Sequence, residues 1–408
     1  MKLRVNARCV TVLALLFFST LTPAFAQTDK DEVIQKLIAR VDALEREVAA
    51  LKLGTVPSSG STASANTEMP DQSAVHEATP AQEDSRFTFH GYADLGFQRN
   101  VDGDSSKRFA LGEVDLWATA RISPKVNALL ETVLETDNQV VVASVPVNVE
   151  RLLLQYHYND YFNLDAGAYR TAIGYYSTAY LRGSWLQTAI SRPKLFEFED
   201  DGGFLPLHNA GLSANGNIPS GPVGLHYVVE AGSSRNYGQS STGYNFSQNA
   251  AVNLALCARP RALPGFEVGF SSYRDRFSPE QGYSMARSVW TGHVVYQAHR
   301  IEFLNEAVWA KFRHPQDGQG NVPGFYSQLA YRVGSSWSPY VRFEDIHATG
   351  TGLVGAYAPQ IVPWRTAETF GVRYDLADAV AVKFEAGRGT SQLRPFWIQA
   401  AVQVAFTF

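Results

Sequence analysis

From residue 86 onward the chain alternates apolar and polar side chains with a period of two, and this pattern constrains the fold most. In the first such segment, Phe87, Phe89 and Leu95 alternate with polar residues such as Thr88 and Asp94. A β-strand turns successive side chains to opposite faces, so each segment predicts a strand with one apolar and one polar face. The sixteen predicted strands span residues 86–99, 109–122, 125–136, 147–158, 162–170, 207–216, 223–232, 250–258, 265–274, 287–297, 300–312, 324–333, 337–346, 364–375, 379–388 and 397–408.

The connections between these segments fall into two length classes that alternate along the chain. Residues 100–108, 171–206, 233–249 and 347–363 form long connections, whereas 123–124, 159–161, 298–299, 334–336 and 376–378 are tight. A closed antiparallel barrel with both chain ends at one rim requires this alternation and an even number of strands. A soluble β-sandwich would also show alternating strands, but it has no reason to sort its connections by length. We therefore predict an all-β fold, a 16-stranded antiparallel transmembrane β-barrel over residues 86–408.

Residues 1–26 have the features of a secretory signal peptide. Three basic residues precede an apolar run at residues 10–18, and Ala24-Phe25-Ala26 resembles a small-x-small cleavage site. The apolar run is shorter than the roughly 18 to 20 residues of a membrane-spanning helix. Cleavage after Ala26 would leave Cys257 as the one thiol, so no internal disulfide is expected.

Residues 27–53 predict a short α-helical coiled coil, because apolar residues recur at alternating steps of three and four. These residues are Ile34, Leu37, Val41, Leu44, Val48 and Leu51. The alternative is an amphipathic helix that lies on its own domain, and the number of helices in the coil stays open. Residues 54–85 are rich in Ser, Thr, Ala, Pro and Gln and predict a flexible linker. We expect the coil to lie in the periplasm, where it could contact the cell wall.

Charge and motif content argue against two other classes of protein. Residues 86–408 carry 27 basic and 28 acidic side chains, a balance that gives no footprint for nucleic acid. The sequence has no G-x-S-x-G, no H-E-x-x-H and no Cys/His arrangement, so we expect no catalytic, cofactor or metal site and no enzyme. Four histidines are isolated in the sequence and predict ordinary lumen or loop residues: His157, His208, His226 and His293.

The last segment ends on Phe408, and Ile398, Val402, Val404 and Phe406 share its face. In this segment and in the long third outer connection, residues 171–206, the chain resembles bacterial outer-membrane porins with sixteen strands. The resemblance covers residues 86–408. It implies a homotrimer in outer-membrane lipid that lets small polar or charged solutes diffuse passively through a lumen narrowed by the third outer loop.

The resemblance assigns the pore constriction to the third outer loop. Its candidate residues are Arg182, Arg192, Lys194, Glu197, Glu199, Asp200 and Asp201. Its four carboxylates cannot all face a low-dielectric wall, so we expect them to meet water, cations or basic partners. The alternative is an exposed acidic loop or a local calcium site, although the oxygen spacing of a calcium loop is not matched.

Strand parity predicts a basic wall opposite this loop. Apolar residues such as Val341 and Phe384 should face lipid, which turns their neighbours Arg342 and Lys383 into the lumen. The full predicted set is Arg121, Arg151, Arg332, Arg342, Arg373 and Lys383. An acidic loop facing a basic wall would create a transverse field across the pore. Alternatively, single arginines merely pair with carboxylates of neighbouring strands, such as Glu344.

Two families of substrate-specific porins are further resemblances. The barrel has 22 Arg and 5 Lys, similar to the arginine ladders of phosphate-selective porins, but the fifth outer loop, 275–286, lacks Lys. Sugar-specific porins with an N-terminal coiled coil are matched by the predicted coil, and four aromatic residues of the third loop could stack on sugars or merely pack the loop. These are Tyr175, Tyr176, Tyr180 and Trp185. A structural tether that acts through the coil is the alternative of another class.

Aromatic residues near predicted strand ends suit the interfacial girdles of a membrane barrel. The examples are Trp117, Tyr156, Tyr158, Trp309, Tyr331, Tyr340 and Tyr374. Any β-rich protein shows a similar enrichment, so the girdle prediction depends on the barrel itself.

Overall fold

The computed structural model describes most of the chain from Arg86 to its end. The described residues are 86–100, 107–135, 147–180, 182–199, 203–235, 246–247, 249–278, 284–350, 364–391 and 396–408. The predicted signal peptide, coiled coil and linker, residues 1–26, 27–53 and 54–85, lie outside the described residues.

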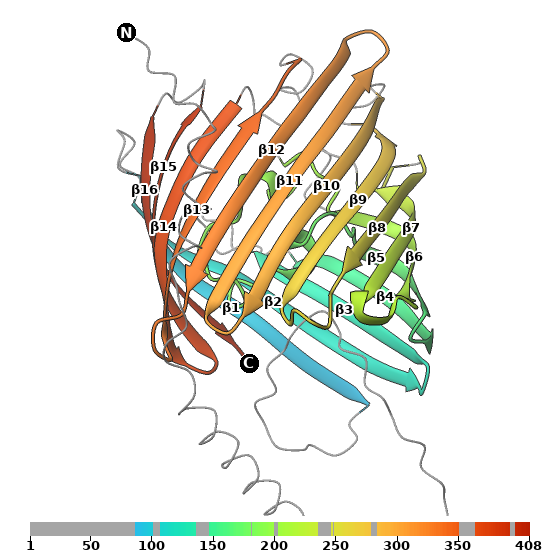
Figure 1. The fold of residues 1–408 in the computed structure, drawn as a ribbon, viewed down its shortest axis with the longest axis horizontal. Helices are drawn as coiled ribbons and strands as arrows, with labels where there is room; N and C mark the ends of the chain where they lie inside the picture. Colours follow the sequence, from blue (N-terminus) through green and yellow to red (C-terminus); the bar gives the residue numbers. More distant parts are fainter. Residues whose placement is uncertain are drawn as a thin grey trace, which may run out of the picture. The chain divides into compact units, whose positions relative to one another are not determined.

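Sixteen strands run in chain order around one closed barrel (Figure 1). Their bounds are β1 Phe87–Asn100, β2 Lys107–Ser123, β3 Val126–Glu135, β4 Val147–Asn159, β5 Phe162–Arg170, β6 His208–Ile218, β7 Leu225–Ser234, β8 Ala251–Ala258, β9 Phe266–Phe277, β10 Met285–Ala298, β11 Ile301–His314, β12 Gly318–Tyr331, β13 Trp337–His347, β14 Trp364–Ala377, β15 Val380–Ser391 and β16 Trp397–Thr407. The all-β fold class and the strand number predicted from the sequence are confirmed.

The barrel closes where the first strand meets the last. β1 and β16 pair antiparallel from Tyr92↔Thr407 to Asn100↔Gln399. Phe408, the residue after β16, continues this pairing with Gly91 of β1. The Gly91 amide donates to the Phe408 carbonyl at 2.8 Å, and the Phe408 amide donates to the Gly91 carbonyl at 3.0 Å. The terminal aromatic residue is therefore part of the seam. Closure gives every strand a paired neighbour on both sides, so the backbone groups of the ring are satisfied where it crosses the membrane interior.

Alternating burial along the strands separates an outer face from an inner face. On β15, Lys383 and Glu385 are buried, whereas Phe384 between them is 46% exposed. On β13, Val341 is exposed and Arg342 is buried. On these two strands the large apolar side chains thus point away from the barrel and the buried ionisable ones point into it, as strand parity predicts.

β12 begins six residues before the predicted strand at 324–333, so this boundary was wrong. The residues Gly320, Pro323 and Gly324 favour a loop in sequence. In the structure, β12 pairs with β11 along its whole length but with β13 only from Gly324 onward. Pro323 therefore lies where β12 has one strand neighbour, and an edge position tolerates a residue without an amide hydrogen.

Two of the predicted girdle residues face the lumen instead. Trp117 shares the inner face of β2 with Asp115 and packs edge-on against Tyr92 at 5.9 Å between ring centroids. Tyr340 is buried on β13, and its hydroxyl donates to Glu385 at 2.7 Å. Both residues lie at strand positions whose side chains alternate toward the lumen. This alternation, and not the position near a strand end, decides the direction of the two side chains.

The described part of the chain also contains three short helical turns, α3 Tyr176–Ala179, η1 Lys194–Phe196 and η2 Gly221–Val223. Within the described ranges, no helix combines the length and the apolar character that crossing a membrane would need. The first two turns belong to the long connection between β5 and β6.

The outward face predicts the effect of a charge placed in it. Phe384→Arg, near the middle of β15, should lower the free energy of unfolding in a bilayer by roughly 2 to 4 kcal/mol, because a guanidinium would have to enter the hydrocarbon. Ile122→Arg is the matched control, since Ile122 is exposed near the turn at 124–125. Its cost should be about 0 to 1 kcal/mol. Chemical unfolding in vesicles measures both values, and equal costs would contradict the assigned outer face.

Candidate functional site in the lumen loop

The connection between β5 and β6, residues 171–207, folds inside the barrel, and we call it the lumen loop. Figure 1 shows it as green coil within the ring of strands. Its apolar side chains, Ile173, Leu195 and Phe196 among them, are buried in one cluster with Val308 of β11 and Tyr326 of β12. The loop therefore packs against the wall that β11 and β12 form.

Carboxylates of the wall accept hydrogen bonds from the amides of the loop backbone. Glu306 of β11 accepts from Tyr175 at 2.6 Å and from Tyr176 at 2.9 Å. Glu385 of β15 accepts from Ile190 at 3.0 Å. Two further carboxylates act in the same way, Glu230 of β7 toward Ala172 at 3.2 Å and Glu344 of β13 toward Lys194 at 2.6 Å.

Cations of the wall donate to the carbonyls of the same loop. Arg342 of β13 donates to the Ser191 carbonyl at 2.7 Å and to the Ser191 hydroxyl at 2.6 Å. Arg373 of β14 donates to the Trp185 carbonyl at 2.5 Å. Lys383 of β15 donates to the carbonyls of Ser184 and Ala189, and Arg287 of β10 donates to that of Phe204 at 3.1 Å.

These contacts fix the path of the loop. Charge-assisted hydrogen bonds are about twice as strong as neutral ones, and several of these groups are almost fully buried. The charges also compensate one another, because Arg342 donates to Glu344 at 2.9 Å on the same strand. Removing one partner would leave a buried charge without compensation, which is the costly case.

On the opposite side the loop reaches β2 and β4. Arg182 donates to Glu113 at 2.8 Å and to Glu150 at 3.0 Å. The Phe198 ring lies between the guanidinium carbons of Arg182 and Arg192, at 3.7 and 3.3 Å from its centroid. The loop thus contacts both sides of the lumen.

His208 joins the loop to β4. Its Nε2 lies 2.6 Å from Glu150 and its Nδ1 lies 3.1 Å from Glu199. Burial alone would raise the pKa of the Glu199 carboxyl. His208, the backbone hydrogen bonds that Glu199 accepts, and Arg235 together hold this pKa below its usual value. The sequence suggested that His208 is isolated, but the start of β6 lies beside two carboxylates, Glu199 of the preceding loop and Glu150 of β4.

Arginine and aromatic side chains line the inner face of β1, β2 and β4. The guanidinium carbon of Arg151 lies 4.6 Å from the Trp117 ring centroid, and that of Arg373 lies 5.5 Å from the Trp185 ring centroid. Tyr92 connects the two rings, since it stacks on Trp185 at 6.3 Å. Trp185 thus belongs to the lumen loop and contacts side chains of the wall from β1 and β14.

The structure places the predicted constriction residues as follows. Glu197 pairs with Lys194, Glu199 accepts the Leu207 amide at 2.7 Å, and Arg192 donates to the Phe196 carbonyl at 3.3 Å. Asp200 and Asp201 lie outside the described residues. The described members of this set are thus brought together in one segment, and their role at a constriction remains a prediction.

The predicted basic wall separates into two groups. Arg342, Arg373 and Lys383 bind the loop backbone, and Arg151 pairs with Glu131. Arg332 follows the end of β12, is exposed and pairs with Asp375 at 2.7 Å. Arg121 is exposed near the end of β2. The last two belong to the rim of short turns rather than to the surroundings of the loop.

Strand parity missed two residues of this site. Glu150 should face lipid beside Leu152, but a bulge in the register between β3 and β4 turns both Glu150 and Arg151 inward. Arg170 has outward parity too, yet it is the last residue of β5 and pairs with Glu131. Nothing in the alternating pattern marks a bulge. The position of Arg170 directly before a long loop was the one available signal.

The aromatic residues proposed for sugar stacking are packed in the structure. Tyr176 and Tyr180 are buried, and the Tyr176 hydroxyl donates to Gln187 at 2.6 Å. The Tyr175 hydroxyl donates to Gln297 of β10 at 2.6 Å. Among the described residues, no group of three or more His, Cys, Asp or Glu side chains is arranged to hold a metal ion.

The anchoring contacts predict the effect of removing one cation. In Arg342→Met the carbonyls of residues 191 and 192 and the Glu344 carboxylate would lose their partner, so the loop should leave the wall more often. An Ala189→Cys reporter, buried in the parent, should then react at least about tenfold faster with an impermeant maleimide in a Cys257→Ser background. Arg388→Met is the control, since Arg388 pairs with Glu368 on the outer face, and equal rates in both variants would contradict the anchoring role.

No protein-family model and no curated sequence matches the chain. Solved structures do match. An anion-selective porin from Comamonas acidovorans has a TM-score of 0.56 at 12% identity, over 79% of this chain and 99% of that one. The outer membrane channel DcaP of Acinetobacter baumannii gives 0.55 at 9%, over 79% and 97%. OmpF of Salmonella typhi gives 0.54 at 12%, over 79% and 97%. Residues 86–408 have the fold of the sixteen-stranded bacterial outer-membrane porins.

Proposed function

We propose that the protein is an outer-membrane porin that lets small polar or charged solutes diffuse passively. The observation that carries the proposal is a closed sixteen-stranded barrel with many ionisable side chains buried on its inner face and large apolar side chains exposed over most of its outer face. Such a barrel is stable in lipid and offers a polar path through it. Similar structures include an outer membrane channel and an anion-selective porin, which supports this function.

The lumen loop is the proposed constriction. It contacts β11, β13 and β15 on one side and β2 and β4 on the other, so it narrows the path between them. The anchoring bonds keep it there against thermal motion. A solute would then pass beside the side chains of Lys194 and Glu113, which are about a third exposed and whose charges act at short range.

Weak selectivity follows from how the lumen charges are distributed. Many lumen arginines are matched by carboxylates, such as Arg287 with Asp275 at 2.5 Å and Arg182 with Glu150 at 3.0 Å. A paired arginine exerts a smaller field on a passing ion than a free one does. A porin specific for phosphate-like anions is the second candidate, supported by the group of Arg151, Arg170 and Arg182 around the loop and by the anion-selective porin among the similar structures.

Planar-bilayer recordings test this proposal. The folded full-length protein should give persistent, ohmic single-channel steps with a small reversal potential under a salt gradient. Replacing residues 184–196 by a shorter Gly-Ser linker should enlarge the steps, because the proposed constriction is removed. Absence of conductance from folded protein would refute the porin function, and unchanged steps in the shortened variant would refute the constriction.

We further propose that the barrel is a homotrimer with an exported N-terminus, in which the predicted coil occupies the periplasm. One similar structure is described as the trimer form of OmpT, an outer membrane protein of Vibrio cholerae, at 11% identity and a TM-score of 0.52. The heptad pattern of residues 27–53 and the signal-like residues 1–26 support the rest.

Deleting residues 28–84 separates a porin from a tether that acts through the coil. The truncated protein should conduct as the parent does, because the barrel closes without these residues. Conductance is measured in bilayers, and envelope attachment by co-sedimentation with purified cell wall. Lost conductance would contradict the proposed independence of the pore, and wall binding that disappears with unchanged conductance would add a tether role.

A further inference from the structure

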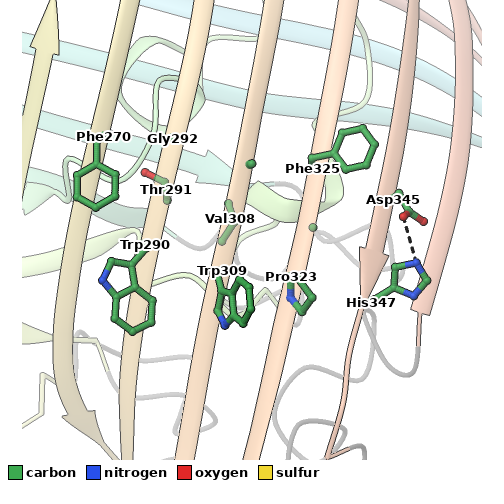
Figure 2. A pocket seen from close by; sticks show the side chains of 12 residues that line it. Phe270, Trp290, Thr291, Gly292, Val308, Trp309, Pro323, Phe325, Asp345 and His347 are labelled. Atoms are coloured by element: carbon green, nitrogen blue, oxygen red, sulfur yellow. Dashed lines mark ion pairs between the residues drawn. The ribbon is translucent and has the colours of Figure 1, made fainter. Parts of the chain in front are cut away.

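The outward face of β9–β12 carries a hollow that belongs to neither the lumen nor the lumen loop (Figure 2). It is lined at its base by Gly292, which has no side chain, and by Ala307, whose side chain is a single methyl group, and this leaves the space open. The rings of Phe270, Trp290 and Trp309 stand around this base, and the hollow has a volume of about 410 Å³. Its dimensions and apolar rings suit a hydrocarbon chain.

A second hollow shares the same two tryptophans. It has a volume of about 440 Å³ and is lined by Trp290, Trp309, Lys311 and Asn321. Trp290 and Trp309 are direct cross-strand partners, and Figure 2 shows their rings side by side on the outer face. The two hollows are therefore adjacent: the first has an apolar lining, the two indoles are shared, and the second includes the cation Lys311.

Three more cations lie on this face beyond the tryptophans. Arg274 of β9 and Lys311 of β11 both pair with Ser288 of β10, so their backbones are two strand spacings apart, about 10 Å. Arg276 and Arg313 occupy the equivalent positions one pleat farther toward the long connections. We call Arg274, Arg276, Lys311 and Arg313 the outer cationic patch.

The patch carries uncompensated positive charge. The outward positions of β9–β12 contain no Asp or Glu, and within the described ranges no ion pair involves any patch residue. On the neighbouring strands the outward charges are paired, Glu368 with Arg388 at 2.5 Å and Asp345 with His347 at 3.1 Å. Asp345 and His347 also line the first hollow, and they compensate each other there. Four like charges that face a membrane are unfavourable unless an anion accompanies them.

We propose that the patch and the two hollows form a binding site for a phosphorylated, acylated lipid of the outer leaflet, with the chemistry of lipid A. The headgroup phosphates accept hydrogen bonds from the arginine forks and Lys311, which match phosphate geometry and charge. The indoles of Trp290 and Trp309 lie at the level between headgroup and chains that tryptophan favours. One acyl chain occupies the hollow above Gly292 and Ala307.

A second copy of the chain fits this face less well. In a two-fold contact through the patch, each cationic patch would oppose its own copy, and the like charges would repel; in the head-to-tail contact of a trimer, the patch would instead need an acidic surface opposite it. A lipid headgroup supplies the opposite charge and a chain for the hollow at once.

Lipid retention in native mass spectrometry tests the site, with the full-length folded protein and diphosphorylated lipid A as the probe. Arg274→Gln/Lys311→Gln should weaken binding at least about tenfold, since two charge-assisted contacts are lost. Arg261→Gln/Arg300→Gln is the matched control. It removes two exposed cations from the rim of short turns and should leave binding unchanged.

Gly292→Leu tests the hollow separately. A Cβ at this position meets nothing nearer than the Gly269 carbonyl oxygen at 3.9 Å, so the variant should fold while its side chain fills the space. It should weaken binding of the acylated lipid about tenfold and leave binding of a deacylated, phosphorylated headgroup unchanged.

Four outcomes would overturn the site. These are equal binding by the test and control double variants, equal binding of dephosphorylated lipid A, saturation by inorganic phosphate at the same concentration as the lipid, or a changed oligomeric state in place of lost lipid. Bilayer conductance of the same variants should match the parent, so failure of the lipid site and failure of the pore are distinguishable.

Discussion

Pairing between β1 and β16 is the interaction on which the whole structure depends. An antiparallel sheet of fifteen pairings would present two unpaired edges to hydrocarbon, where each unsatisfied backbone group costs several kcal/mol. The sixteenth pairing, extended by the bonds between Gly91 and Phe408, removes both edges at once. Once the ring is closed, every side chain must point either to lipid or to the lumen. The separation of Phe384 from Lys383 is a direct result.

The lumen loop shows how the polar interior of such a ring is used. A barrel of sixteen strands encloses more space than side chains alone fill, so the loop occupies part of the lumen and the remainder is left for solutes. Buried carboxylates and guanidinium groups, such as Glu306 and Arg342, would be costly in an empty wall facing an apolar segment. Here the loop backbone satisfies them, and they in turn satisfy the loop. The chemistry of the wall and the position of the loop therefore depend on each other.

The sequence predicted the strands well because lipid and lumen enforce a strict period of two, and this period survives even in weakly apolar segments such as β6. It failed where the backbone departs from that period. The bulge at Glu150 reverses which side chains face the lumen, and Pro323 lies in a strand because its neighbour on one side ends early. The contacts of the loop could not be predicted either. Many of them join residues that are more than 100 positions apart, such as Tyr175 with Glu306, and depend on where a folded backbone presents its amides.

The charged side chains of the wall bind the lumen loop chiefly through hydrogen bonds to its main-chain amides and carbonyls. Every amino acid except proline offers the same amide and carbonyl, so this part of the attachment does not depend on which side chains the loop carries, whereas the packing of Ile173, Leu195 and Phe196 against the wall does. Residues of the loop that face the passage can thus be exchanged during evolution without loosening the loop. In such a barrel, substitutions in the loop can change which solutes pass, while the wall residues that bind the loop backbone stay the same.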